Sequence, residues 1–125
     1  MNIAILNTPW CYDALNLGRS LNMSNEISIK KLQNFIKSKD FNPNLKQEYF
    51  LKLIEEVGEL SEAIRKDIRL KDSDIKGTVE EELYDVLYYV LALANVYDIN
   101  LEECAQLKEK INKEKYNHKV NLETT

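Results

Sequence analysis

The chain carries two pairs of acidic residues inside stretches that otherwise have the apolar spacing of buried helices. The first pair is Glu56 and Glu59, and the second is Glu82 and Asp85. Residues three positions apart share one face of a helix, so each pair presents two carboxylates side by side. Apolar residues surround the first pair, and the uncharged run 86–94 follows the second. Carboxylates in such surroundings resist desolvation and repel one another, and a bound divalent cation relieves both effects.

The rest of the chain also favours long helices. Only three Gly and two Pro occur in 125 residues, which leaves few places to turn. Apolar residues recur at the helical period in several separate segments, which predicts an all-α protein. The expected helices cover about residues 25–39, 45–70, 79–98 and 101–117. The third is apolar on nearly all sides past its first turn, so we expect it to be central.

Side chains that cap helices set the expected starts. Ser24 is the expected N-cap of the first helix, with Glu26 in its first turn. Thr78 and Glu81 have the spacing of a capping box. Asn100 is the expected cap of the last helix.

Length and pattern predict one domain with a short segment on either side. Residues 1–22 fit poorly with the helical pattern and are expected to be an extension outside the core. Residues 23–117 form the predicted domain, beginning at a methionine that resembles a natural translation start. Residues 118–125 are expected to be a flexible tail.

Composition argues against several kinds of partner and site. A net charge of −4 disfavours binding to nucleic acid polymers, which reward a basic surface. The longest uncharged helical stretch is too short to cross a membrane, and no secretory signal is visible. Two cysteines without metal or redox spacing fit reduced thiols, so the expected location is the cytoplasm.

The four carboxylates indicate a hard-oxygen metal site. Donors of this kind favour Mg²⁺, with Mn²⁺ as the alternative. The only histidine, His118, lies in the tail, which argues against di-iron, Ser-His-Asp and Cys-His sites. Pairs of acids also arise often in a chain with 21 acidic residues, so solvated acids near the edge of the core remain the alternative reading.

Residues 53–60, LIEEVGEL, and 81–87, EELYDVL, resemble the MazG-like all-α nucleoside triphosphate pyrophosphohydrolases. The signature of that family is E-x-x-E, a spacer, and E-x-x-D. The similarity to single-domain members such as the dCTP pyrophosphatases extends from about Ile29 to Tyr116. It implies a four-to-five-helix bundle that forms homodimers or homotetramers. It also implies Mg²⁺-dependent cleavage of a (d)NTP to the monophosphate and pyrophosphate, in a role of cleaning the nucleotide pool.

The resemblance also implies roles for individual residues. The metal ligands would be the four paired acids, Glu56, Glu59, Glu82 and Asp85. The proton acceptor would be a ligand such as Glu59, or Glu55, which faces about 100° away from Glu56 on a helix and for which a solvated role is the alternative. The expected substrate contacts are Phe41, Lys52, Tyr89, Lys108, Asn112 and Lys115.

For these substrate contacts an ordinary structural role stays open. Phe41 and Tyr89 have positions suited to stacking on a base, whereas aromatic residues at helical spacing more often pack in a core. Lys52 is placed to meet a phosphate or to remain a surface lysine. Lys115 stands where relatives carry arginine, which forms the better bidentate phosphate contact. The competing interpretation of the whole chain is a non-catalytic helical association module.

Overall fold

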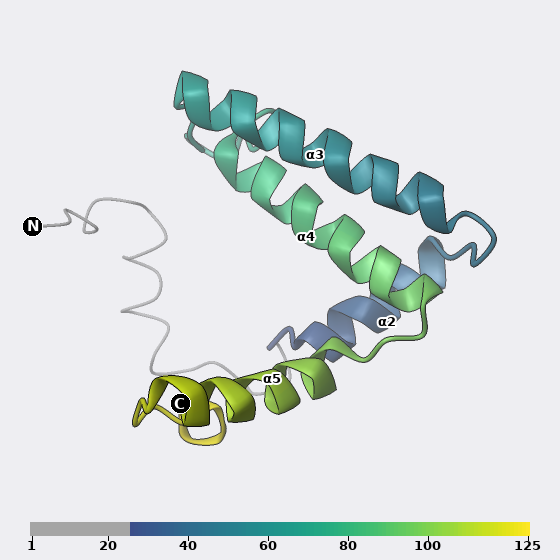
Figure 1. The fold of residues 1–125 in the computed structure, drawn as a ribbon. Helices are drawn as coiled ribbons and strands as arrows, with labels where there is room; N and C mark the ends of the chain where they lie inside the picture. The colour runs from purple at the N-terminus through teal and green to yellow at the C-terminus, as the bar shows by residue number, and fades with distance from the viewer. Residues whose placement is uncertain (1–25) are drawn as a thin grey trace, which may run out of the picture.

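The computed structural model describes residues 26–125, and this part of the chain is all-α (Figure 1). Its helices are α2 Ile29–Lys39, α3 Lys46–Lys66, α4 Val79–Val96 and α5 Leu101–Tyr116, followed by the short 3₁₀ helix η3 Leu122–Thr124. The prediction of an all-α fold is therefore confirmed. Residues 1–22 lie outside the described part, so the proposed domain boundaries stay a prediction.

Two of the expected helix ends are wrong. The N-cap of α2 is Ser28, whose Oγ accepts a hydrogen bond from the Lys31 backbone N–H at 3.1 Å. Ser24 lies outside the described residues, and Glu26 precedes the helix rather than occupying its first turn. Ser28 is the better cap because it directly precedes the apolar stripe that α2 buries.

The second wrong end is that of α3, which stops at Lys66 rather than near residue 70. Asp67 takes a left-handed conformation with φ of 50°, which ends the helix. The backbone then turns to meet the start of α4, where the Val79 N–H donates to the Ile68 carbonyl at 2.8 Å. The Leu70 N–H donates to the Glu80 carboxylate at 2.9 Å. These bonds replace those that a longer α3 would make.

The other expected caps are confirmed. Thr78 Oγ1 accepts a hydrogen bond from the Glu81 N–H at 3.2 Å, and the Glu81 carboxylate accepts one from the Gly77 N–H. Asn100 Oδ1 accepts from the second and third N–H groups of α5, at 3.1 and 3.4 Å. Side-chain oxygens thus satisfy backbone donors at both helix starts.

α3 and α4 lie side by side as an antiparallel hairpin, and α2 lies against the end of α4 farthest from the hairpin loop (Figure 1). The core gathers at that end. It consists of Ile36, Tyr49, Leu91, Ala92 and Val96. α5 diverges from the hairpin and buries none of its residues.

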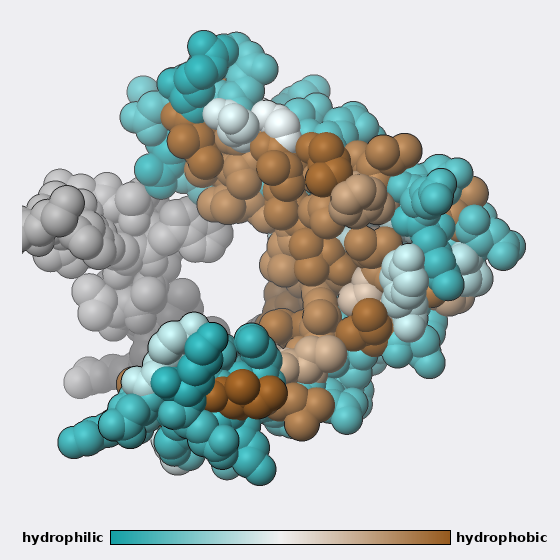
Figure 2. Space-filling view, viewed as in Figure 1, coloured by the Kyte–Doolittle hydropathy of each residue, from teal (hydrophilic) through white to brown (hydrophobic). Residues whose placement is uncertain are grey.

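The expectation that the third helix is central holds only for its second half. Residues 91, 92 and 94–96 of α4 are buried, whereas Leu83 and Leu87 in its first half are exposed. A large apolar face is visible over the hairpin in Figure 2. No helix among residues 26–125 has the length and apolar character needed to cross a membrane.

A buried polar network joins α2 to the turn between α4 and α5. Gln33 Nε2 donates to Asn95 Oδ1 at 3.1 Å and to the Ile99 carbonyl at 2.9 Å. Asn95 Nδ2 donates to the Gln33 carbonyl at 2.9 Å, and Gln33 Oε1 accepts from the Leu101 N–H at 3.2 Å. Buried amides of this kind stabilise the fold only while all their groups remain paired.

We therefore expect Asn95→Ala to lower the free energy of unfolding by about 1–3 kcal/mol, because it leaves buried groups of Gln33 without partners. The exposed Asn34, which follows Gln33 on α2, offers a control. Asn34→Ala should change the free energy of unfolding by less than about 0.5 kcal/mol. Urea unfolding followed by circular dichroism measures both. Equal effects of the two substitutions would contradict a stabilising role for the network.

Candidate functional site

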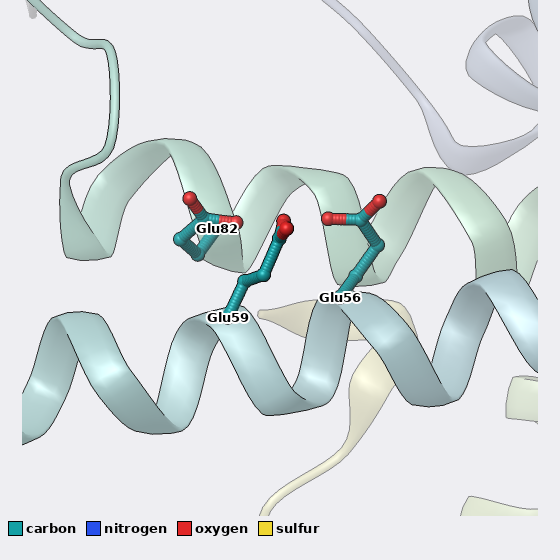
Figure 3. A group of neighbouring side chains, drawn as sticks. All are labelled: Glu56, Glu59 and Glu82. Atoms are coloured by element: carbon teal, nitrogen blue, oxygen red, sulfur yellow. The ribbon is translucent and has the colours of Figure 1, made fainter.

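Three carboxylates meet between α3 and α4. Glu56 and Glu59 extend from α3 toward α4, and Glu82 of α4 lies beside Glu59 (Figure 3). One oxygen from each of these three side chains lies within 4.8 Å of the others. We call these three residues the carboxylate cluster. The hairpin thus brings together acids that are separated by more than twenty positions in sequence.

The cluster is held in unfavourable electrostatic surroundings. Glu56 and Glu82 are each only 8% exposed. Burial, a hydrogen bond to Glu59 and the negative charge of that residue raise the pKa of Glu56 to about 7. Burial and the charges of Glu59 and Asp85 raise the pKa of Glu82 above its ordinary value. Such shifts show that the ionised forms lack sufficient compensation from the protein alone.

These residues fit a divalent cation. The donors are all carboxylate oxygens, which is the ligand type that Mg²⁺ and Mn²⁺ prefer. Glu82 Oε2 is buried without a hydrogen-bond partner among the described residues. A cation would place positive charge next to this unpaired oxygen. The same charge would lower the raised pKa values of Glu56 and Glu82.

Asp85, the fourth expected ligand, lies next to the cluster but outside the set of three close oxygens. Burial, together with the charges of Glu81 and Glu59, raises the pKa of its carboxyl group. Its charge in turn raises the pKa of Glu56. The residue is therefore close enough to share an electrostatic field with the cluster.

A pocket of about 320 Å³ opens beside the acids. Its lining consists of Lys39, Glu56, Tyr84, Asp85, Tyr88 and Tyr89. We call it the tyrosine pocket. Tyr88 packs edge to face against two other rings. Its ring centroid lies 6.4 Å from that of Tyr84 and 5.2 Å from that of Tyr89. Aromatic walls next to a set of acids that could hold a metal ion suit a ligand that has both a flat ring and a charged group.

Tyr89 faces two pockets, since it also lines a smaller one with Tyr49 and Lys52. Lys52 Nζ lies 6.0 Å from the centroid of the Tyr89 ring and 3.0 Å from a carboxylate oxygen of Glu55. Glu55 is therefore engaged in an exposed ion pair and is outside the carboxylate cluster. The structure brings Tyr89 and Lys52 near the acids, and it directs Glu55 elsewhere.

The remaining expected contacts lie apart from the tyrosine pocket. Phe41 lies beneath the ammonium group of Lys37 and is absent from the pocket lining. On α5, Asn112 donates to Glu109 at 3.0 Å, and Lys115 lies over Tyr116. α5 diverges from the hairpin in Figure 1, and Lys108 is likewise absent from the lining.

Comparison with known proteins gives the family. The model of the MazG nucleotide pyrophosphohydrolase domain matches residues 45–119, more than half of the chain. The chain belongs to the MazG nucleotide pyrophosphohydrolase family. The matched segment contains α3, α4, α5 and every residue of the carboxylate cluster. No curated protein matches the chain.

Two solved MazG structures support the same assignment. Both are crystal structures of iMazG from Vibrio DAT 722 and are 53% identical to this chain. The match to the form named Ntag-iMazG spans 74% of this chain and 100% of the iMazG chain, with a TM-score of 0.69. The match to the form named Ctag-iMazG spans 70% of this chain and 99% of the iMazG chain, with a TM-score of 0.67. The family resemblance inferred from the acidic motifs is therefore confirmed.

Sequence reasoning missed three side chains that line the tyrosine pocket: Lys39, Tyr84 and Tyr88. Tyr84 and Tyr88 could have been found, because they lie four positions apart and therefore on one side of α4. Lys39 could not, because only the packing of α2 against the hairpin brings it there. This MazG chain therefore assembles its candidate site from three helices rather than two.

The raised pKa of Glu56 predicts how stability changes with pH. Its value of about 7 in the folded chain exceeds the ordinary 4.5, so the protonated carboxyl stabilises the fold at low pH. That contribution is present below about pH 4.5 and is lost as the pH rises through about 7. Without metal, Glu56→Gln should therefore show a smaller fall in melting temperature between pH 5 and pH 8 than the wild type.

Added Mg²⁺ should raise the melting temperature of the wild type more at pH 8 than at pH 5, because ionised carboxylates bind it better. Differential scanning fluorimetry measures both effects. Glu114→Gln, which alters an exposed acid of α5, serves as the control and should keep the wild-type dependence on pH. Identical curves for the Glu56 and Glu114 variants would show that burial of Glu56 has no such consequence.

Proposed function

We propose that this chain is a Mg²⁺-dependent pyrophosphohydrolase that cleaves a nucleoside triphosphate between its α- and β-phosphates. The products would be the monophosphate and pyrophosphate, which suits a cytoplasmic role in removing surplus or non-standard nucleotides. The observation that carries the proposal is the close approach of three carboxylate oxygens, two of them from buried residues, beside a pocket with aromatic walls.

The reaction needs a water molecule, a proton acceptor and charge compensation. Water attacks the α-phosphorus, the bond from that phosphorus to the bridging oxygen breaks, and pyrophosphate leaves with the bridging oxygen. Glu56, Glu59 and Glu82, with Asp85 beside them, would hold the cation. When bound, Mg²⁺ supplies positive charge for the phosphate oxygens and acidifies the attacking water.

Glu59 is the better candidate for accepting the proton from that water. Its carboxylate lies between those of Glu56 and Glu82 (Figure 3). Glu55 instead forms an ion pair with Lys52 and lies outside the carboxylate cluster. We therefore assign the proton to Glu59 and give Glu55 a role in positioning Lys52.

Tyr89 and Lys52 would serve the nucleotide itself. Tyr89 lies between the tyrosine pocket and the smaller pocket that Lys52 lines. A base stacked on the Tyr89 ring would leave its phosphates directed toward the acids. Phe41 lies outside both pockets, so a contact with the base would require Phe41 to move.

The proposal also includes self-association. Exposed apolar residues repeat at helical spacing on both hairpin helices, and we call them the exposed apolar stripe. Its members are Phe50, Ile54, Val57 and Ile64 of α3 and Leu83, Leu87 and Val90 of α4. A second copy of the chain would remove this surface from water and complete the homodimer or homotetramer.

A second copy would also account for the two lysines and the asparagine expected to contact substrate from α5. Lys108, Asn112 and Lys115 lie on a helix that diverges from the hairpin of their own chain. Contact of these residues with substrate phosphates therefore requires α5 of a neighbouring copy. This arrangement would make the complete site a property of the oligomer.

Glu59→Gln and Asp85→Asn should each abolish detectable pyrophosphate release from (d)NTPs in the presence of Mg²⁺. Both remove a negative charge from the site while preserving side-chain size, so we expect the variants to fold. Glu62→Gln is the matched control, and it should retain most of the activity because Glu62 is an exposed acid of α3 that pairs with Lys66. A screen over the common and modified (d)NTPs, with pyrophosphate as the readout, also identifies the preferred base.

The same variants test the competing interpretation, a non-catalytic helical association module. In that case the wild type would release no pyrophosphate. The amide variants would be at least as stable as the wild type, because they bury less charge, and would have no other effect. An active Glu59→Gln variant would refute the assignment of the proton acceptor.

The double variant Ile54→Lys/Leu87→Lys should be monomeric, because it places two charges on the exposed apolar stripe. Light scattering after size-exclusion chromatography measures the mass. Val120→Lys introduces a charge at a residue that is 65% exposed and outside the stripe, and it should leave the oligomer intact. A wild-type mass equal to that of one chain would contradict the role of the stripe in self-association.

A further inference from the structure

Lys39 is the only cation that lines the tyrosine pocket in the described part of the chain. It is the last residue of α2, whereas the other lining residues belong to α3 and α4. Two acids, Glu56 and Asp85, line the same pocket. A positive group thus lines the same pocket as two of the acids.

The ammonium group of Lys39 is held by aromatic rings rather than by a carboxylate. It lies 4.9 Å from the centroid of the Phe35 ring and 5.1 Å from that of Tyr88. The ion pairs within residues 26–125 use Lys52, Arg65, Lys66 and Arg69, and none uses Lys39. Ring faces position a cation but do not neutralise it, so its charge stays available to an anion.

The backbone beside Lys39 is fixed by the next residue, Asp40. Tyr49 of α3 donates its hydroxyl hydrogen to Asp40 Oδ1 at 2.7 Å, and Tyr88 of α4 donates to Oδ2 at 3.0 Å. The Tyr49 hydroxyl in turn accepts from the Asn42 N–H at 3.0 Å. We call Asp40, Tyr49 and Tyr88 the Asp40 clamp. It joins the end of α2 to both hairpin helices.

A simpler explanation for Lys39 is the favourable interaction of any cation with a helix C-terminus. Lys37 shares that explanation, because it also lies in the last turn of α2 and also lies over an aromatic ring. Lys37 does not line the tyrosine pocket, and the residue that follows it is not part of the Asp40 clamp. The chain therefore contains its own comparison between a pocket lysine and an ordinary one.

We propose that Lys39 binds the phosphate chain of the nucleotide, and that the Asp40 clamp positions it. The proposal rests on the proposed function and names a further residue of that site. An ammonium group is a compact donor with three N–H groups, which suits phosphate oxygens better than the edge of a base. The tyrosine rings that line the rest of the pocket leave the charge of Lys39 for the anionic part of the ligand.

The experiment measures binding of inorganic tripolyphosphate in the presence of Mg²⁺ by calorimetry, alongside kinetics with the best (d)NTP. Lys39→Gln should weaken tripolyphosphate binding about tenfold, since one charge-assisted contact is lost. KM should rise by a similar factor while kcat changes little, because the contact exists before the reaction. Lys39→Arg should retain most of the affinity, and Lys37→Gln should match the wild type.

A double-mutant cycle tests the clamp. Asp40→Ala should also weaken tripolyphosphate binding, and the double variant Lys39→Gln/Asp40→Ala should bind no worse than Lys39→Gln alone, because the clamp acts through Lys39. Additive losses would show that Asp40 affects binding independently of Lys39, and this would refute the positioning role of the clamp. The same variants measured at rising salt should show a weaker salt dependence wherever Lys39 is replaced by glutamine, which removes its charge.

The outcomes separate this proposal from the proposed function. If Lys39→Gln and Lys37→Gln bind tripolyphosphate equally well, the role of Lys39 is refuted even though the wild type is active. If the wild type binds tripolyphosphate through Lys39 but releases no pyrophosphate, the site is a phosphate-binding site and the proposed function fails. If the wild type does not bind tripolyphosphate with Mg²⁺, the role of Lys39 is refuted, whereas the proposed function is decided by pyrophosphate release alone.

Discussion

Carboxylates occupy positions of the α3–α4 hairpin where packed helices ordinarily place apolar side chains. On α3 the buried residues recur every seven positions as Tyr49, Glu56 and Ala63, so an acid lies in the middle of the stripe that faces α4. Glu82 is buried on the facing helix. This part of the interface gains little from the hydrophobic effect and must hold repelling charges together. The raised pKa values of Glu56 and Glu82 are the consequence.

The hairpin tolerates this because it is fixed on either side of the acids. At one end, Leu91 and Ala92 pack with Ile36 in the core, and both Leu91 and Ile36 have no exposed surface. At the loop end, Arg69 pairs with Glu80 at 2.8 Å and the backbone bond between Val79 and Ile68 joins the helices. The acids are therefore held close together by contacts that do not involve them. Such preorganisation is what a site requires if it is to bind a cation without first reorganising.

Much of this was predictable from local patterns. The capping residues Thr78 and Asn100, the helical periods and the E-x-x-E and E-x-x-D spacing all act within a few residues, and the structure has them as expected. The misplaced start of α2 is also local, because two serines compete as caps and Ser28 is the one that directly precedes the apolar stripe. The end of α3 depends instead on Glu80, ten positions beyond Leu70, which accepts a hydrogen bond that a longer helix would preclude.

The parts that could not be predicted are those made by tertiary packing. Lys39 and Asp40 look like an ordinary helix end in the sequence, and only the hydrogen bonds to Tyr49 and Tyr88 connect them with the site. The helical period of the apolar residues in α3 is visible in the sequence. The sequence does not show that these residues divide between two surfaces. One group of them faces α4, and the group that contains Ile54 and Val57 remains exposed. A helical period identifies the apolar positions of a helix, but it does not show which surface packs against each of them.

That division joins assembly to chemistry. Glu56 and Val57 are adjacent, so a helix turns only about 100° between the stripe that carries the carboxylate cluster and the stripe proposed to contact a second copy. The same holds on α4, where Glu82 is buried and Leu83 is exposed. Any contact that moves α3 relative to α4 through the exposed apolar stripe also changes the spacing of the carboxylate oxygens. If the chain self-associates and binds a cation as proposed, the two events would be coupled through the same two helices, because each would restrict the same movement.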